Sequence, residues 1–400
     1  MTLVELFERT PIENMISALT LSPEKIIFVG VPSQMRTPVQ RYRRFLAESG
    51  RKCETVTVGI DKNDLSDTVN ALTRIVLTEK DCVFDITGGD DLTLFALGTV
   101  FEKLRPTHKM EVHRVSLATG KFIDCDGNGI NCADESAAID INSLVALFGG
   151  KVRAKTVFPN GEVHKKAIDA LWEVSKKEPK EWNVKCSILK EFEKAASEHG
   201  NDVEALAQYI NGYSRKKPKF VSFAQQLSAE GIIEVKKRDL TDFRYGYRDE
   251  FTKECLDKAG NILEHKVYSE VLNASQNGVP FFTDAAMGVT IDWDGELHSS
   301  DVPDTTNEID VIAMHGTTPV FISCKNGSID EVELYKLNTV AARFGGAYAR
   351  KVLFATDFSR PSAMSEKAFY QRAADMNIKI VPNAAELSSK EWNIALIGAV

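Results

Sequence analysis

Short apolar runs alternate with amphipathic stretches over the first 150 residues. The run at 25–31 has the continuous apolar character of a buried strand, and residues 36–49 carry apolar side chains at helical spacing. The alternation continues with strands expected at 53–58 and 82–86 and helices at 65–77 and 92–104. This pattern predicts a doubly wound α/β domain with a largely parallel sheet, whose ligand crevice lies beyond the carboxyl ends of the strands.

Two loops follow strands at the end where such a crevice forms. One is residues 31–34, and the other is residues 85–91, in which Gly88 and Gly89 let a backbone approach a ligand closely. The G-x-G-x-x-G pattern of dinucleotide sites is absent, and the aspartates of the second loop would repel a pyrophosphate. Hydroxyls and base amines suit these carboxylates better. Alternatively, the glycine pair only permits tight packing, and Asp91 only caps the next helix.

The segment 124–135 matches the spacing of an EF-hand calcium loop letter for letter. The residues before it have the character of a strand and not of a helix. Asn131 also occupies a position where an EF-hand has an apolar anchor. A β-hairpin that turns at 126–128 explains the same letters, and we predict this hairpin.

A helix at 133–148, ending at Gly149 and Gly150, is expected to close the first domain at residue 150. Residues 151–249 have a different character, because charged helical segments replace the apolar runs. We expect a connector here, with a winged-helix-like arrangement as one option. Its helical segments are expected at 165–176, 187–199 and 202–211.

Three stretches of the connector carry basic or aromatic side chains. The basic runs 215–219 and 236–238 would either contact a nucleic-acid backbone or simply be solvated. Residues 243–248 combine aromatic and basic side chains. That combination suits stacking and phosphate contact with a single strand, and it equally suits a packed hinge between domains.

The last 150 residues predict a second α/β domain, which we place at 250–400. A polar loop is expected at 297–306. The predicted elements are a helix at 260–273 that carries Glu264, a strand at 289–294, a hairpin at 308–327, a helix at 331–344, a strand at 351–355, a helix at 362–376 and a strand at 378–381.

The hairpin at 308–327 gathers charged residues along one edge. Its arms flank a Gly-Thr-Thr turn, with Asp310 on one arm and Lys325 on the other. Side chains two apart share a strand face, so Glu308 joins Asp310 and Ser323 joins Lys325. Carboxylates beside a lysine suit metal-assisted phosphodiester cleavage. Alternatively, these are solvated charges of an edge strand that discourage aggregation.

Composition narrows the class of protein. The chain has 400 residues, 43% of them hydrophobic and 26% charged, and a net charge of −8, so any nucleic acid should meet a local basic lining. Seven cysteines lack C-x-x-C spacing, which argues against a zinc site or a disulfide framework. A signal-peptide core and a run of eighteen apolar residues are both missing from the sequence, so we expect a cytoplasmic protein that does not enter a membrane.

The order of elements from Glu264 to residue 344 resembles the PD-(D/E)XK nuclease core. The sequences at 260–264 (GNILE), 307–310 (NEID) and 324–327 (CKNG) narrow the resemblance to CRISPR-associated nucleases that carry a CARF sensor domain. The resemblance implies a catalytic set of Glu264, Asp310, Lys325, Glu308 and Ser323. It also implies Mn²⁺ or Mg²⁺ held by Glu264, Asp310 and the carbonyl oxygen of Cys324.

Ser323 departs from the family pattern, which has Asp or Glu two residues before the lysine. Either another carboxylate supplies the missing acid, or the metal site is weakened. By sequence Glu308 is the best candidate, because it shares the strand face of Asp310 and lies one strand across from Ser323. Glu331 and Glu333, on the helix after the hairpin, are the alternatives.

Both loops of the first domain resemble the ligand loops of CARF domains, and residues 4–14 resemble the N-terminus of the same branch. The resemblance implies a Rossmann-like sensor domain at 1–150 that forms a homodimer and binds a cyclic oligoadenylate, for which tetra-adenylate is the usual ring size. The expected ligand contacts are Pro32, Ser33, Gln34, Thr87, Gly88, Gly89 and Asp90.

The two resemblances together predict a function. We expect a cyclic-oligoadenylate-activated, metal-dependent endonuclease of type III CRISPR antiviral defence that cleaves DNA, RNA or both. The alternative is a cyclic-nucleotide-binding regulatory protein whose nuclease domain is weakened or inactive.

Overall fold

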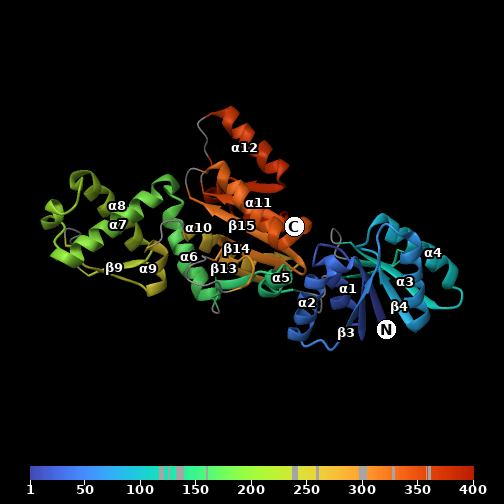
Figure 1. Ribbon diagram of the computed structural model, residues 1–400. Helices are drawn as coiled ribbons and strands as arrows, with labels where there is room; N and C mark the ends of the chain where they lie inside the picture. Colours follow the sequence, from blue (N-terminus) through green and yellow to red (C-terminus); the bar gives the residue numbers. More distant parts are fainter. Residues whose placement is uncertain are drawn as a thin grey trace.

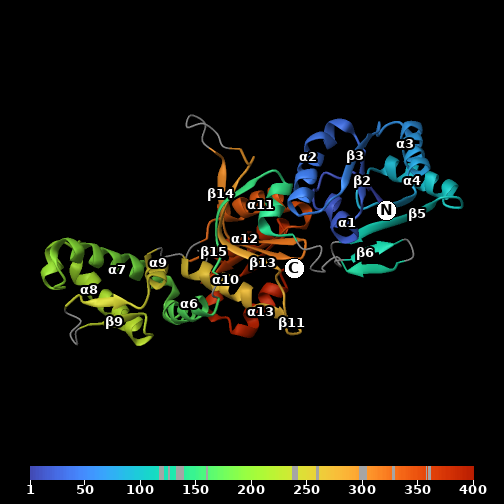
Figure 2. The ribbon, with the colours of Figure 1, turned by 90° about the horizontal axis from the view of Figure 1, so that it is seen from below.

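The computed structural model describes residues 1–116, 121–124, 127–131, 139–158, 161–236, 242–257, 261–296, 304–326, 329–356, 358 and 362–400. Three bodies lie in a row (Figure 1). A first domain is built on one β-sheet, a central body is built on a second sheet, and a small helical module lies on the side away from the first domain. The view from below shows the same order (Figure 2).

The first sheet has the strand order β3-β2-β1-β4-β5-β6-β7, and its run from β3 to β5 is parallel. Its strands are β1 (Thr2–Leu6), β2 (Lys25–Gly30), β3 (Glu54–Gly59), β4 (Asp81–Asp85), β5 (Lys109–Ser116), β6 (Lys121–Asp124) and β7 (Gly129–Asn131). The predicted α/β class with a parallel-rich sheet is confirmed. The central strand β1 is not among the predicted strands, because the charged Glu5 interrupts its short apolar run.

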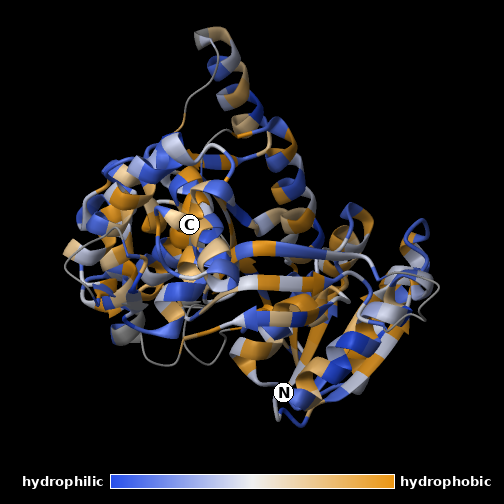
Figure 3. Cartoon of the chain, turned by 90° about the vertical axis from the view of Figure 1, so that its left-hand side faces the viewer, coloured by the Kyte–Doolittle hydropathy of each residue, from blue (hydrophilic) through white to orange (hydrophobic). Residues whose placement is uncertain are grey.

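Helices cover both faces of this sheet. They are α1 (Glu13–Leu21), α2 (Pro32–Glu48), α3 (Leu65–Thr78) and α4 (Asp91–Leu104). Successive residues of β1 point to opposite faces, so Leu3 joins the core beneath α1 and α2 whereas Val4 joins the core beneath α3 and α4. Figure 3 shows the helices carrying both hydrophobic and hydrophilic residues, as covering helices do.

The segment with EF-hand spacing is part of a β-hairpin. β6 and β7 pair antiparallel, so the predicted hairpin is confirmed, and the element before it is strand β5. One carboxylate oxygen of Asp124 accepts a hydrogen bond from the backbone N–H of Asn128 at 2.8 Å. Asp126 and Glu135 lie outside the described residues, as do residues 133–138 of the helix predicted at 133–148. Residues 139–140 are not helical, and the helix is α5 (Ile141–Leu147), which begins after its N-cap Asp140.

The second sheet has the order β17-β16-β15-β14-β13-β8. Its strands are β8 (Lys151–Thr156), β13 (Asp284–Asp292), β14 (Thr306–His315), β15 (Thr318–Lys325), β16 (Arg350–Ala355) and β17 (Ile378–Val381). One face is covered by α6 (Gly161–Ser175), α10 (Asn261–Asn273) and α13 (Ser389–Ile397), and the other by α5, α11 (Glu331–Gly345) and α12 (Ala363–Asp375). The elements predicted from residue 308 to 381 lie within one or two residues of these bounds.

The connector range contributes directly to the second sheet. β8 pairs with β13, where Ala154 lies opposite Thr290, and so forms an edge of the sheet. Its alternating charges, Lys151, Arg153 and Lys155, are typical of an edge strand and conceal it in the sequence. Helix α6, from the same range, packs against α10. The second sheet therefore draws on residues before 250.

The helical module has its own core. Its elements are α7 (Pro179–His199), the 3₁₀ helix η2 (Ala205–Gln208), α8 (Tyr213–Ala229), β9 (Ile233–Val235), β10 (Tyr245–Tyr247) and α9 (Glu250–Asp257). The helix predicted at 202–211 is therefore only a short 3₁₀ helix. Phe192 stacks on Phe220 with ring centroids 4.3 Å apart. No helix within the described ranges is both long and apolar enough to cross a bilayer.

The aromatic residues at 243–248 point into this module. Phe243 stacks on Phe220 at 4.9 Å, and the hydroxyls of Tyr245 and Tyr247 both donate to one oxygen of Glu193, at 2.7 and 2.5 Å. Burial raises the pKa of both tyrosines. These rings are half-buried against the core of the module, and together with Lys236 and Arg244 they line a pocket of about 440 Å³.

Candidate active site and ligand pocket

The charged hairpin opens where the ladder between β14 and β15 stops. The last pair of the ladder is Val311 with Ile322, so the next position places Asp310 across from Ser323. Here the Asp310 carboxylate replaces the backbone partner. Its Oδ2 accepts a hydrogen bond from the N–H of Cys324 at 2.6 Å and one from the Ser323 hydroxyl at 3.1 Å. The side chain thus holds the two strands apart at the end of the ladder.

Lys325 reaches the same carboxylate. Its Nζ lies 3.6 Å from Asp310 Oδ2 and 3.0 Å from Glu333 Oε2 of α11. Burial by itself would lower the pKa of Lys325, but Asp310 and Glu333 raise it above the usual value. The lysine is therefore a fixed cation at neutral pH, in contact with one carboxylate from the hairpin and one from the helix.

Glu333 is the carboxylate that stands closest to Lys325 among the three candidates for the missing acid. Burial raises its pKa, but hydrogen bonds from Lys336 and Lys325 outweigh this effect and lower the pKa overall. Glu331, two residues earlier on α11, instead pairs with Arg372. From the sequence, the two glutamates of α11 are equally good candidates for the missing acid. In the structure they have different partners, and Glu333 is the one that contacts Lys325.

Glu264 approaches the site from α10, and Glu308 lies two residues before Asp310 on β14. Glu264 is half-buried on α10, and it contributes, after burial and Asp310, to raising the pKa of the Cys324 thiol. Glu308 is exposed, and its Oε1 lies 3.7 Å from the place that a Cβ on Gly288 would take. Gly288 has a φ of +56° within a bulge of β13, opposite Asp310, so no side chain stands at this position across from the carboxylate.

The proposed ligand atoms are all oxygens, the donor type that binds hard divalent ions. Two carboxylates and a carbonyl oxygen are ligands that Mg²⁺ and Mn²⁺ prefer. Among the described residues, however, no group of three or more His, Cys, Asp or Glu side chains is placed to hold a metal. The hydroxyl of Ser323 stands where a further carboxylate would complete the set. The site therefore has fewer acidic ligands than the family pattern provides.

A pocket of about 170 Å³ opens at the carboxyl ends of the strands in the first sheet. Of the seven ligand contacts expected from the sequence, Gln34, Gly89 and Asp90 line it, whereas Pro32, Ser33, Thr87 and Gly88 do not. Its other lining residues are Phe7, Glu8, Arg9, Val29, Gly30, Val31, Ile60, Lys62 and Thr93.

Two of the expected ligand contacts, Thr87 and Gly88, have structural roles in the loop. A Cβ on Gly88 would lie 2.3 Å from the carbonyl oxygen of Leu6, so tight packing requires glycine there. Thr87 donates its hydroxyl to Asp85 and accepts the N–H of Val115 at 2.7 Å. These residues build the loop that shapes the pocket.

The start of α4 is capped by a residue of the pocket. Asp90 accepts hydrogen bonds from the N–H and the hydroxyl of Thr93, both at 2.9 Å. The cap is therefore Asp90, and not Asp91 as the packing alternative proposed. The neighbouring Gly89 has a φ of +91° and lines the pocket.

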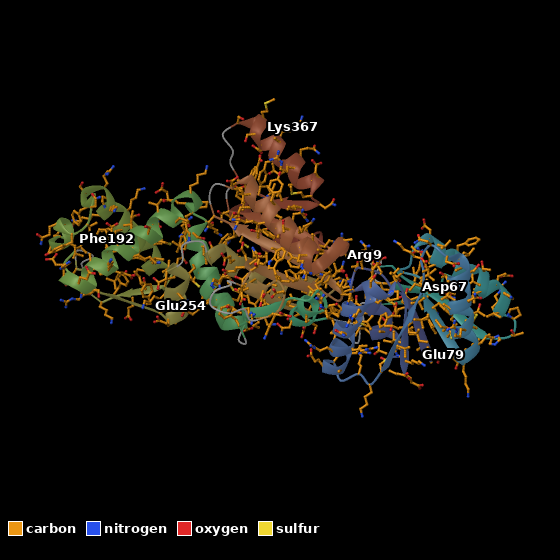
Figure 4. All side chains as sticks on the ribbon, in the orientation of Figure 1. Arg9, Asp67, Glu79, Phe192, Glu254 and Lys367 are labelled. Atoms are coloured by element: carbon orange, nitrogen blue, oxygen red, sulfur yellow. The ribbon has the colours of Figure 1, made fainter. Side chains whose placement is uncertain are left out.

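The pocket combines opposite charges. Arg9 and Lys62 supply cations, while Glu8 and Asp90 supply carboxylates. Asn14 fixes the segment with Arg9, because its side chain accepts the N–H of Glu8 at 2.9 Å and donates to the carbonyl of Glu8 at 2.7 Å. Figure 4 shows Arg9 on the flank of the first domain nearest the central body. Such a set can bind phosphates as well as hydroxyls and amines.

Sequence reasoning missed Arg9 and Lys62. Arg9 follows β1 directly, so it can be found only once β1 is identified as a strand. Lys62 follows β3 in the same way. Their shared signal is a cation three residues beyond the carboxyl end of a parallel strand.

The architecture defines the class of fold: a Rossmann-like domain, a helical module and a mixed sheet with a charged hairpin. Solved structures share it over the whole chain. Protein VC1899 from Vibrio cholerae matches with a TM-score of 0.73 and 18% identity, covering 99% of this chain and 96% of that one. Can2 from Sulfobacillus thermosulfidooxidans, solved in complex with cyclic tetra-adenylate, matches with a TM-score of 0.66 and 16% identity, covering 99% and 98%.

These matches show that the fold of the whole chain, including its Rossmann-like first domain, is shared with these two proteins. At the level of sequence, no protein-family model and no curated protein matches the chain.

Proposed function

We propose that this protein is a nuclease controlled by a cyclic oligoadenylate and acts in type III CRISPR defence. The observation that carries the proposal is the end of the β14–β15 ladder, where Asp310 and the protonated Lys325 lie 3.6 Å apart across from Gly288, which has no side chain. The whole-chain fold supports it, because Can2 was solved with cyclic tetra-adenylate.

The residues of the hairpin would divide the chemistry. Lys325, positioned by Glu333, would stabilise the negative charge that develops on a phosphodiester during cleavage. Glu264, Asp310 and the carbonyl oxygen of Cys324 would hold Mn²⁺ or Mg²⁺, which supplies an activated water when bound. Glu333 is the strongest candidate for the acid that Ser323 lacks, because it already contacts Lys325.

The ligand pocket would be completed by a second copy of the chain. A pocket of about 170 Å³ holds only part of a cyclic tetra-adenylate. A ring with internal symmetry fits a two-fold interface, so we propose a homodimer with the ligand across its axis. Arg9 and Lys62 would contact its phosphates, and Glu8 and Asp90 its hydroxyls or base amines.

We propose a division into sensor, connector and nuclease, which the sequence predicts at 1–150, 151–249 and 250–400. Within the expected connector range, β8 and α6 belong with the nuclease body, because β8 pairs with β13 and α6 packs against α10. The connector resembles a winged helix in its order of α7, η2, α8, β9 and β10. An isolated bridge between Asp202 and Asp242 adds the short strand contact typical of that order. Ligand binding would shift the nuclease through α5, which packs against both α2 and α11.

A cleavage assay tests the proposal. Purified protein should cleave labelled nucleic acid in Mn²⁺ or Mg²⁺ only when cyclic tetra-adenylate is present, and Asp310→Ala should not. The second candidate is a regulatory protein without chemistry, which Ser323 and the short acid set favour. Tight binding of the ligand with no cleavage at any metal concentration would establish that second function.

A further inference from the structure

A groove runs between α7 and α8, on the side of the helical module next to the active site. It encloses about 520 Å³, and we call it the α7–α8 groove. The residues that matter for its chemistry are Asn183, Ser187, Glu191, Arg215, Lys216 and Lys219. Three cations of the basic run 215–219 therefore line the groove, whereas Lys217 pairs with Glu204.

The groove is joined to the charged hairpin by a direct contact. The side-chain amide of Asn183, at one end of the groove, donates to the backbone carbonyl of Asn326 at 3.3 Å. Asn326 immediately follows Lys325. Its own side-chain amide is buried, and neither its nitrogen nor its oxygen has a hydrogen-bond partner in the structure as described. A buried amide without partners is costly unless a ligand satisfies it.

The cations of the groove can exchange their partners for phosphates. Lys216 pairs with Glu191 at 2.5 Å, and Lys219 pairs with Glu181. Both pairs are partly exposed, and such pairs contribute little to stability, so a polyanion can displace them. Arg215 lies in the groove and pairs with no carboxylate of a described residue.

The outer face of α7 extends the positive charge. Lys190 and Lys194 are exposed at helical spacing from Ser187, and within the described ranges neither forms an ion pair. From Asn183 to Lys194 the helix rises roughly 16 Å, at about 1.5 Å per residue. Although the chain carries a net charge of −8, this track begins beside Lys325 with amides and continues with cations.

We propose that the α7–α8 groove binds the phosphodiester backbone of the nucleic-acid substrate and leads it to Asp310 and Lys325, with Asn326 contacting the strand at the junction. The inference rests on the proposed nuclease function and assigns its substrate track. Recognition is by backbone charge, so DNA and RNA share the chemistry that it reads.

Binding measured without cleavage tests the groove. Full-length Asp310→Ala protein, with cyclic tetra-adenylate present, is titrated against fluorescent single-stranded DNA, duplex DNA and RNA by anisotropy at several salt concentrations. Adding Lys190→Glu and Arg215→Glu should weaken binding of at least one probe by about tenfold or more. The slope of log affinity against log salt should also fall, by about one for each phosphate that the protein no longer neutralises.

Matched variants separate the groove from general charge. Lys52→Glu, an exposed lysine at the amino end of β3, should leave affinity unchanged. Asn326→Ala should weaken binding with little change in the salt slope, because it removes hydrogen bonds and not charge. Circular dichroism melting confirms that each variant is folded. Equal affinity and equal slope for the Lys190→Glu, Arg215→Glu protein on all three probes would overturn the proposal. Failure of wild-type protein to cleave, with groove-dependent binding intact, would overturn the nuclease function alone.

Discussion

The site on the second sheet is built from the side chains of two neighbouring strands, whereas the pocket of the first domain is built from strand ends and helix starts. At the hairpin, Asp310, Ser323 and Lys325 meet because their positions in β14 and β15 bring them together. In the pocket, Asp90 and Gly89 are lining residues that also form the turn at the start of α4.

This difference determines how each site should respond to single substitutions. The hairpin site is rigid, since its backbone belongs to the sheet and its charges hold one another. The pocket depends on short segments, such as the one with Arg9, that are fixed by a few hydrogen bonds from Asn14. We expect chemistry to be abolished by single changes in the hairpin and ligand affinity to decline in smaller steps in the pocket.

The largest effect should come from Lys325→Ala. Removal of the cation that faces a developing phosphorane charge should lower kcat by about 100- to 1000-fold. Binding of cyclic tetra-adenylate, measured by calorimetry, should be unchanged, because the pocket belongs to the other sheet. A variant that cleaves at the wild-type rate would show that the hairpin is not the catalytic site.

The next effect tests which acid replaces the one missing at Ser323. Ser323→Glu places a carboxylate beside Asp310 and should lower the metal concentration needed for half-maximal cleavage. Glu333→Gln should raise that concentration and reduce the rate by about tenfold, because it also frees Lys325. Glu331→Gln is the matched control, since that residue pairs with Arg372. Equal metal dependence in all three variants would contradict a compensated site.

A smaller effect is expected in the pocket. Arg9→Ala and Lys62→Ala should each weaken ligand binding by about tenfold, as expected when one charged hydrogen bond to a phosphate is removed. Ser33→Ala, a change at a residue outside the pocket lining, should leave affinity unchanged. The reverse ranking in a calorimetric titration would show that the loop at 31–34 holds the ligand in place of these cations.

Much of the fold can be predicted from the pattern of apolar residues, and each element that the pattern misses is missed for a physical reason. The hairpin could be placed because alternation along a strand determines which side chains share a face. β1 could not, because buried Glu5 looks like a surface charge in the sequence, and Arg9 was missed with it. β8 was hidden by its edge-strand charges. Gly88 and Thr87 were correctly placed in a loop, but whether a loop residue faces the ligand or supports the backbone depends on contacts such as that between Gly88 and Leu6.

Glu5, the buried residue that conceals β1 in the sequence, provides the last test of how the pocket and the hairpin site differ. Glu5 lies beside Asp85 in the neighbouring strand, and one oxygen of Glu5 is buried without a hydrogen-bond partner in the structure as described. Burial is the main cause that raises the pKa of Asp85 to about 7, and burial followed by the charge of Asp85 raises that of Glu5. The folded state therefore keeps protons that the unfolded chain releases near pH 4.

Stability should consequently be highest at low pH and fall as the pH rises toward 7, by on the order of 1.4 kcal/mol per unit of pKa difference. Asp85→Asn removes one of the two charges and should flatten this dependence, so the variant should match wild type at pH 5 and melt at a higher temperature at pH 8. Thermal melts at both pH values measure the effect, with Asp67→Asn, an exposed carboxylate of α3, as the control. Parallel melting curves for wild type and Asp85→Asn across this range would mean that Asp85 is already ionised in the folded protein. The first domain would then contain a buried, charged carboxylate beneath the pocket. In that case the pocket, like the hairpin site, would be supported by fixed charges.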